Sequence, residues 1–199
     1  MGDSYLLLAE KAAMFVSHLF ETPHLSPFPY HNILHTKKVA EHSSMLSRFY
    51  SLDEKDHSIV LISAWFHDIG QIYGDMKGHE QRGVEIMKNF MGNFNTTADF
   101  TAAIEGCILA TATGSTPDSL PEKILCDADT WHFGTIEFRK TEFLVKAEME
   151  LRTGRPFRHW HSQSILMLEN HVYYTEYCQL HLVKGKKENI NWLRSLNDG

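Results

Sequence analysis

The stretch AWFHDIG, residues 64–70, places the adjacent polar residues His67 and Asp68 at the end of an apolar segment. Two consecutive side chains on a helix point about 100° apart. Both can therefore reach one ion only if it lies at the helix end, or if Asp68 swings across that end. Gly70 follows and favours a helix stop that opens room for a ligand. The stretch predicts a ligand site at the end of a core helix.

Apolar residues recur at helical spacing along nearly the whole chain, as Ile59, Ile62 and Phe66 illustrate. Clusters of Pro and Gly separate the periodic segments. The pattern predicts an all-α fold, a single-domain helical bundle. Its helices are expected near residues 4–20, 31–50, 53–68, 79–92, 97–110, 136–152, 158–180 and 186–196.

The composition excludes several classes of protein. The chain has 199 residues, 43% of them hydrophobic, which is enough for one core. A formal net charge of -6 gives no basic field for polymeric nucleic acid. No apolar run is long enough to span a bilayer, so we expect a soluble, cytoplasmic protein with no membrane partner. Three scattered cysteines indicate no disulfide framework, and thirteen histidines suggest metal or acid–base chemistry.

A second motif, YHNILHTKKV at residues 30–39, puts His31 and His35 one helical turn apart. The pair could be a metal grip, a proton donor beside a metal ligand, or two histidines that share a face. The zinc protease pattern does not apply, because Asn32 follows the first histidine and cannot act as a general base. Downstream, LCDADTW supplies Asp127 and Asp129 in an apolar stretch. A buried carboxylate needs a partner or a metal, so at least one of the two is expected to have one.

Taken in order, these motifs resemble the HD superfamily of metal-dependent phosphohydrolases, in an uncharacterised bacterial-type branch. The resemblance runs over about residues 28–135, from YHNILHTKKV through AWFHDIG and HEQRGVEIM to ILCDADTWHFG. It implies one domain over residues 1–199, with this segment as the HD core and C-terminal helices over 136–197. It also implies a divalent metal ion held by His35, His67, Asp68 and Asp129. Asp127 is the alternative to Asp129 as the last ligand.

The resemblance implies further roles around the metal. Glu80, or Asp68 itself, would orient or activate the attacking water; the alternative for Glu80 is a solvated glutamate in a first helical turn, and we favour the role toward water. His31 would protonate the leaving oxygen, as the histidine of a similar stretch does in the distantly related cyclic-nucleotide phosphodiesterases. His79 matches a position that helps to hold a second metal in binuclear members. The segment CILATATGS carries no histidine, however, which favours one metal and leaves His79 as a substrate-facing group.

Beyond residue 136 the resemblance is weaker, and cationic residues are the candidates for binding a substrate phosphate. We expect Lys146 and Arg155 to serve this role, while a solvated helix face is the alternative for such residues. Trp160 could stack on a base or simply lie in the core.

The predicted function is hydrolysis of a phosphomonoester or phosphodiester of a nucleotide or similar small metabolite by metal-activated water. Two histidines with two carboxylates suit Mn, Fe, Co, Ni or Mg. The alternative is a non-catalytic, metal-containing ligand-binding or regulatory HD module. The expected partner is a small phosphorylated substrate, and a homodimer is left open.

Overall fold

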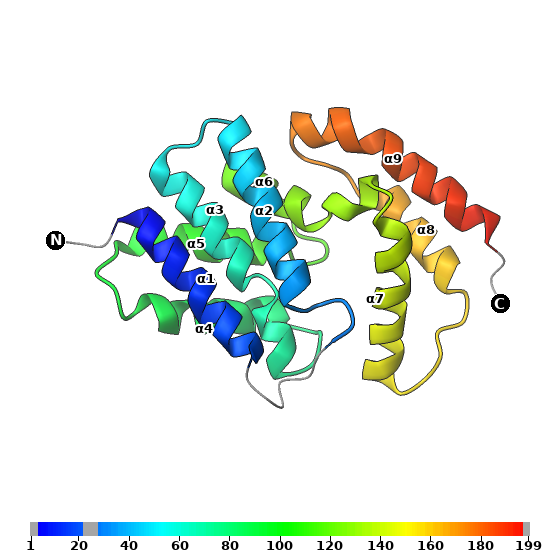
Figure 1. Ribbon diagram of the computed structural model, residues 1–199, viewed down its shortest axis with the longest axis horizontal. Coiled ribbons are helices and arrows are strands. Elements are labelled where there is room, and N and C mark those ends of the chain that lie inside the picture. The colour runs from blue at the N-terminus through cyan, green and yellow to red at the C-terminus, as the bar shows by residue number, and fades with distance from the viewer. Residues whose placement is uncertain (1–3, 22–27, 197–199) are drawn as a thin grey trace. The chain divides into compact units, whose positions relative to one another are not determined.

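A computed structural model describes residues 4–21 and 28–196 of the chain (Figure 1). Within these residues the fold is all-α, as predicted, and contains no strand. The α-helices are α1 (Tyr5–Glu21), α2 (Ile33–Phe49), α3 (Glu54–Phe66), α4 (His79–Met91), α5 (Ala98–Ala110), α6 (Leu120–Asp129), α7 (Phe138–Thr153), α8 (Trp160–Asn170) and α9 (Glu176–Ser195). Two 3-10 helices, η1 (Ile69–Tyr73) and η2 (Trp131–Gly134), lie between them.

The described residues fall into two compact units. The first comprises residues 4–21 and 31–129, and the second comprises residues 28–30 and 130–196. The boundary after Asp129 lies close to the expected end of the HD core at about residue 135. That residues 1–199 form one domain stays a prediction.

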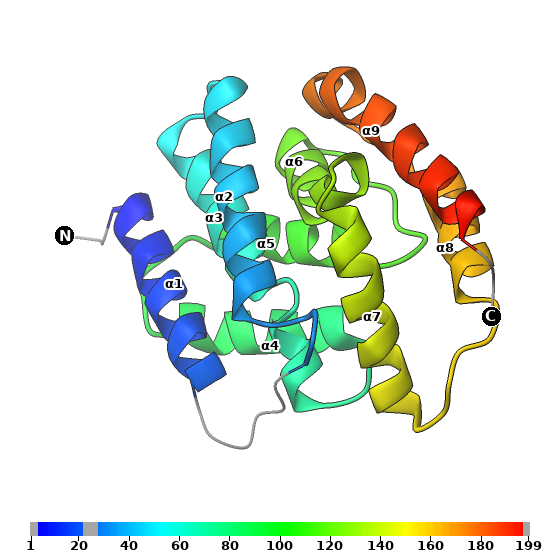
Figure 2. The ribbon, with the colours of Figure 1, turned by 45° about the vertical axis from the view of Figure 1, so that its right-hand side comes forward.

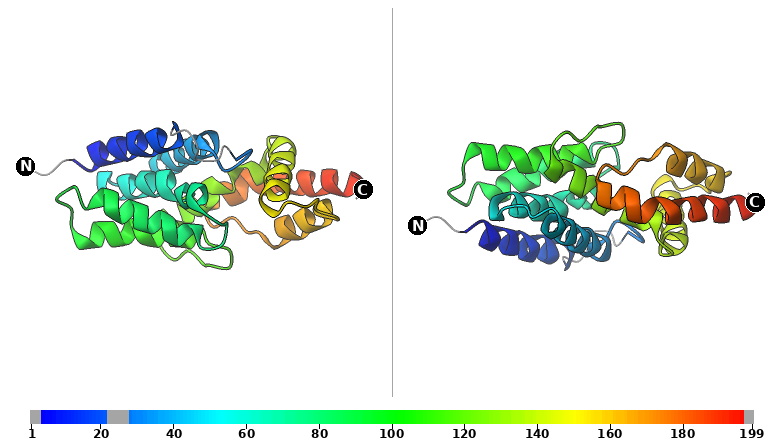
Figure 3. Two further views of the ribbon diagram at one scale, coloured as in Figure 1. Left: turned by 90° about the horizontal axis from the view of Figure 1, so that it is seen from below. Right: turned by 90° about the horizontal axis from the view of Figure 1, so that it is seen from above.

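Helix α3 is the central helix of the first unit. It packs against α1, α2, α5 and α6 (Figure 2), and its side chains from Ser58 to Ala64 are buried except for Leu61. A helix that is apolar on nearly all sides is one that other helices surround. Helices α4 and α5 lie side by side next to it (Figure 3). This core holds the C-terminal end of α3 in a fixed position, and with it the adjacent His67 and Asp68, the HD doublet.

Gly70 has a different role from the one expected. A Cβ added at Gly70 would lie 2.0 Å from the backbone oxygen of His79, and one at Gly83 would lie 2.8 Å from the backbone oxygen of Phe66. Both glycines let backbone segments approach more closely than any side chain permits. Gly70 therefore does not open room for a ligand. It lets η1 pack directly on the start of α4.

The second unit is built from η2, α7, α8 and α9. Helix α9 packs on η2 and α8, and a Cβ added at Gly185 would lie 2.0 Å from the backbone oxygen of Gly134. The buried Asn189 donates from Nδ2 to the backbone oxygens of Phe133 and Thr135, at 2.9 and 2.8 Å. These contacts fix the turn that follows the first unit.

Two predicted helix boundaries are wrong, and one helix was not predicted. The segment 158–180 is interrupted, because α8 ends at Asn170 and α9 begins at Glu176 and runs to Ser195. Thr175 caps α9 by accepting a hydrogen bond from the Cys178 backbone N–H at 3.3 Å. The helix that the sequence did not predict is α6. No helix within the described residues is both long and apolar enough to cross a membrane.

Candidate metal centre

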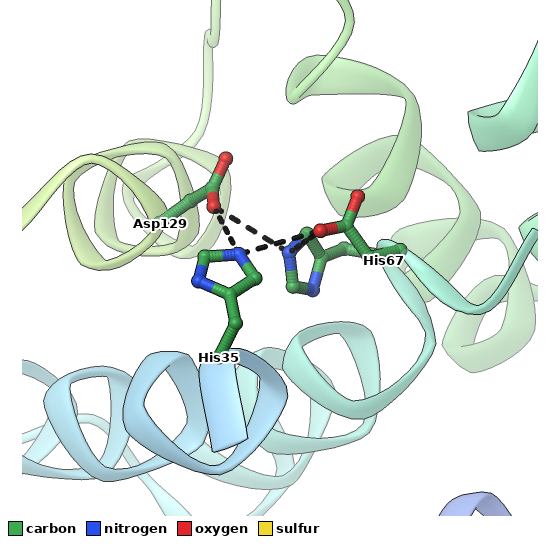
Figure 4. Close-up of side chains that lie close together, drawn as sticks. His35, His67 and Asp129 are labelled. Atoms are coloured by element: carbon green, nitrogen blue, oxygen red, sulfur yellow. Dashed lines mark ion pairs between the residues drawn. The ribbon is translucent and has the colours of Figure 1, made fainter. Parts of the chain in front are cut away.

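Four side chains from three helices meet in the first unit. His35 lies in the first turn of α2, His67 is the C-cap of α3, Asp68 follows it, and Asp129 is the last residue of α6. Figure 4 shows His35, His67 and Asp129 pointing toward one another. One ligand atom from each of the four residues lies within 4.8 Å of the others. Residues far apart in sequence thus form one compact cluster.

Asn32 explains how the first of these side chains is positioned. It is the N-cap of α2, and its Oδ1 accepts hydrogen bonds from the backbone N–H groups of Leu34 at 2.9 Å and His35 at 3.4 Å. The cap fixes where α2 begins. It therefore sets the direction in which His35 leaves the helix.

Within the cluster, each histidine nitrogen lies close to two carboxylate oxygens. His35 Nε2 lies 3.0 Å from Asp129 Oδ1 and 3.3 Å from Asp68 Oδ2. His67 Nε2 lies 3.2 Å from Asp68 Oδ2 and 3.5 Å from Asp129 Oδ1. The Asp68 side chain therefore swings across the helix end to reach the same point as His67.

The cluster fits a divalent metal ion. His67 Nδ1 lies 2.9 Å from the backbone oxygen of Ala64 and donates to it, which leaves the lone pair of Nε2 for the cluster. That Nε2 is buried and makes no hydrogen bond of normal geometry. Two imidazole nitrogens and two carboxylates form a donor set that suits Mn, Fe, Co, Ni or Mg more than an ion that prefers thiolates.

The charges of the cluster compensate one another when only protons are present. Burial lowers the pKa of His35 and of His67, but the carboxylates of Asp129 and Asp68 outweigh burial and raise both pKa values above 6.5. Burial raises the pKa of Asp68, but the neighbouring histidines His67, His31 and His35 outweigh it and hold that pKa well below 3.8. The histidines likewise lower the pKa of Asp129. Without a metal ion, protonated histidines thus stabilise the carboxylates, as a bound metal cation would.

The second oxygen of Asp68 makes contacts of its own. Oδ1 lies 3.2 Å from His79 Nε2, and it accepts a hydrogen bond from Gln71 Nε2 at 3.4 Å. Gln71 is 2% exposed. The sequence pattern does not single out Gln71, and the signal for it is a lone polar residue in the apolar segment IGQI after the doublet. Both contacts hold Asp68 with its other oxygen facing the cluster.

Glu80 and His31 lie beside the cluster. Glu80, in the first turn of α4, places Oε2 at 3.4 Å from His79 Nδ1, which also lies 2.8 Å from the backbone oxygen of Met76. Glu80 is thus joined to Asp68 through His79. The rings of His31 and His35 meet edge to face with centroids 5.9 Å apart.

Arg82 fastens the connection between the doublet and α4. Its guanidinium donates to the backbone oxygens of Gly70 at 3.1 Å and Lys77 at 3.0 Å, and also to that of Asp75. These carbonyls all belong to the segment between the HD doublet and His79. Arg82 therefore fixes the connection that leads to His79 and Glu80 at the start of α4, although the sequence pattern assigns it no role.

The remaining predicted site residues lie outside this cluster. Asp127 is fully buried in α6 but does not belong to the group that Asp129 joins. Lys146, in α7 of the second unit, pairs with Glu150 at 2.5 Å. Arg155 is exposed in the connection after α7. The roles of Lys146 and Arg155 toward a substrate stay predictions.

Comparison with known proteins decides the family. The family model of the HD domain matches residues 32–134, a span that contains all four cluster residues and more than half of the chain. The chain belongs to the HD domain family. HD domains are generally metal-dependent hydrolases, and the cluster is one that could hold such a metal. The assignment to a bacterial-type branch stays a prediction.

A solved structure gives a second likeness to the HD fold. It is described as a predicted HD superfamily hydrolase from an uncultured Thermotogales bacterium. The match covers 93% of this chain and 88% of that chain, with a TM-score of 0.63 and 20% sequence identity. At this identity the likeness shows the fold alone. A search of curated proteins gives no match.

Proposed function

We propose that this HD domain is a phosphohydrolase that cleaves a phosphomonoester or phosphodiester of a nucleotide or similar small metabolite. The observation that carries the proposal is the convergence of His35, His67, Asp68 and Asp129 within 4.8 Å in a chain of the HD family. Buried ionisable groups gathered at one point are costly unless they serve a bound charge.

The four cluster residues would hold one divalent ion, with His67 bound through Nε2. Such an ion supplies a Lewis acid that lowers the pKa of water and offsets negative charge on a phosphoryl group. Gln71 and His79 would keep Asp68 oriented through its second oxygen. The protein thus provides a fixed donor set rather than a flexible one.

Proton transfer would fall to residues at the edge of the cluster. Glu80, or Asp68, would orient the attacking water and accept its proton as the new P–O bond forms. His31 would give a proton to the leaving oxygen as the old P–O bond breaks. The position of His31 beside His35 supports this division of work.

The substrate itself would be small and phosphorylated. His79 would face it, and Lys146 or Arg155 would bind phosphate oxygens. A net charge of -6 supports a small anionic metabolite held by a local cation over a polymeric nucleic acid. A cytoplasmic location belongs to the same proposal.

The test combines metal loading with phosphate release. The full chain is loaded separately with Mn, Fe, Co, Ni or Mg and assayed against nucleoside monophosphates, cyclic nucleotides and nitrophenyl phosphoesters. We expect metal-dependent release, and we expect Glu80→Gln to retain its metal but lose about 100-fold in turnover.

Two outcomes would contradict this proposal. Metal-loaded protein that releases no phosphate from any of these esters would favour the non-catalytic regulatory module instead. A Glu80→Gln variant with an unchanged rate would return Glu80 to the role of a solvated glutamate.

A further inference from the structure

The second unit contains an open cavity of about 270 Å³ that residues of η2, α7 and α8 line. Its walls are mainly apolar and include Phe133, Phe138, Val145 and Met167. All of these residues belong to the second unit, so the cavity is separate from the metal cluster in composition. A cavity of this size accommodates a small organic molecule.

Glu142 lines this cavity and is 2% exposed. Its Oε1 is buried and makes no hydrogen bond of normal geometry, and the buried Nε1 of Trp160, which also lines the cavity, makes none either. His161 Nδ1 lies 3.5 Å from Glu142 Oε1 and pairs with it only when the imidazole is protonated. A buried polar atom left unsatisfied costs free energy, so each such atom calls for an explanation.

Burial has the expected electrostatic effect on this carboxyl group. It raises the pKa of Glu142, although the side chains of Ser164, His161 and Trp160 face the carboxyl and favour its charged form. The protein therefore does not fully compensate the charge that it buries.

A second buried glutamate on the same helix shows what full compensation looks like. Glu148, 1% exposed, accepts a hydrogen bond at Oε1 from Arg152 Nε at 2.9 Å, and Arg152 Nη2 forms an ion pair with the same oxygen at 2.8 Å. Its Oε2 accepts from the Tyr30 backbone N–H at 3.0 Å. Within the described residues, Glu142 has no arginine or lysine in this role. Unlike Glu148, Glu142 lines the cavity, where a bound ligand could supply the cation that Arg152 provides to Glu148.

We propose that this cavity binds a small molecule with an apolar body and a protonated amine, whose N–H groups donate to Glu142. An ammonium group brings a permanent positive charge and up to three donors to a carboxylate that no arginine or lysine among the described residues pairs with. The aromatic rings of Phe133, Phe138 and Trp160 can contact both the apolar body and the cation. A carboxylate or phosphate ligand is excluded from this position because Glu142 would repel it.

Three probes with the same apolar body test the proposal on the full chain: 2-phenylethylammonium, neutral 2-phenylethanol and anionic phenylacetate. Binding is followed by calorimetry and by the NMR signal of the Trp160 indole N–H, assigned with Trp160→Phe. We expect the ammonium to bind about tenfold more tightly than the alcohol, since hydrogen bonds to charged groups are the stronger ones. Phenylacetate is expected not to bind.

Three variants locate the effect. Glu142→Gln keeps the size of the side chain and should remove the preference for the ammonium while the alcohol still binds. Glu150→Gln makes the same change on the same helix outside the cavity and should leave all affinities unchanged. Val145→Phe fills the cavity and should abolish binding of both the ammonium and the alcohol.

The proposal is overturned if the native chain binds none of the probes or binds the ammonium and the alcohol equally. It is also overturned if the preference survives in Glu142→Gln or if binding survives in Val145→Phe. Should Glu142→Gln fail to fold, the probe series on the native chain and Val145→Phe still decide the question.

Discussion

Asn32 acts on the metal cluster through the helix that it caps. Replacing it in Asn32→Ala removes the acceptor for the backbone N–H groups of Leu34 and His35, which should cost about 1 kcal/mol of unfolding free energy. Because His35 lies in that first turn, affinity for a divalent metal should fall as well. Urea denaturation and metal titration measure the two effects separately.

Asp53 provides a matched control, because it caps α3 and accepts from the Asp56 backbone N–H at 2.8 Å. Asp53→Ala should lose similar stability and keep its metal affinity, since no cluster residue lies in the first turn of α3. Equal metal affinity in Asn32→Ala and the native chain would show that the cap does not position His35.

His31 should matter in proportion to how poor the leaving group is. An alkoxide that leaves from a nucleoside needs a proton, whereas a nitrophenolate barely does. His31→Gln should therefore slow hydrolysis of a nucleoside phosphate by about 100-fold and that of a nitrophenyl ester far less, with metal content intact.

The same variant separates the other interpretations of the motif. Loss of metal, with both substrates slowed alike, would make His31 a ligand. A lower melting temperature with unchanged rates per folded molecule would make it a core residue. Either result would reject the role of proton donor.

At the level of elements, η1 and α4 depend on the close approach at Gly70. A Cβ there would meet the backbone oxygen of His79, which no side-chain motion can relieve. Gly70→Ala should cost about 1–3 kcal/mol, the usual range for overpacking, and should shift His79 away from its contact with Asp68. Denaturation and metal affinity report the two parts of this effect.

Gly106, inside α5, is the matched control. A Cβ at Gly106 would lie 3.4 Å from Glu122 Oε1, the end of a flexible side chain. Gly106→Ala should therefore be neutral or stabilising by up to about 1 kcal/mol, because Ala favours a helix interior. A Gly70→Ala variant as stable as Gly106→Ala would contradict the packing of η1 on α4.

Apolar periodicity predicted α1 to α5 and α7 to within two residues at either end, because these helices bury a continuous stripe. Helix α6 was not predicted, since its segment was read for its carboxylates. A capping pair, Ser119 and Glu122, signals its start: the backbone N–H of Glu122 donates to Ser119 Oγ at 3.4 Å. The break before α9 depends on Thr175 as a cap, which periodicity alone does not register.

The four cluster residues were predicted from motif order, and they do lie together. Spacing could not place Gln71 or Arg82, because apolar periodicity does not register a side chain that bonds a carboxylate three residues before it or the backbone carbonyls of a preceding loop. Spacing also gave Gly70 the wrong role, since the close approach to the His79 backbone oxygen arises only when η1 packs on the start of α4. The packing of one element on the next is the part of a fold that apolar periodicity does not contain.

For the whole molecule, the charge balance of the cluster predicts how stability depends on pH. The raised pKa of His67 means that the folded, metal-free protein binds a proton more tightly than the unfolded chain. The resulting stabilisation is present below pH 6.5 and is lost as pH rises through the folded pKa. The unfolding free energy of the native chain minus that of His67→Gln, measured in chelator, should therefore fall as pH rises above 6.5.

His57 gives the opposite sign and serves as the control. Burial, together with the nearby Arg48, lowers the pKa of His57. Protonation of His57 at acidic pH therefore destabilises the folded protein, and this loss of stability disappears as pH rises toward 6.5. The unfolding free energy of the native chain minus that of His57→Gln should therefore rise with pH up to 6.5. A difference for His67→Gln that stays flat or rises above pH 6.5 would contradict the ion pairs of the cluster.

The central claim is that His35, His67, Asp68 and Asp129 hold one divalent metal ion. It is tested most directly by the metal content of the purified full chain beside that of His67→Ala, Asp68→Ala and Glu80→Gln, each checked for helical content by circular dichroism. The account predicts about one ion per chain in the native protein and in Glu80→Gln, and none in the two alanine variants, with helical content kept. Stoichiometric metal retained in both His67→Ala and Asp68→Ala would contradict it.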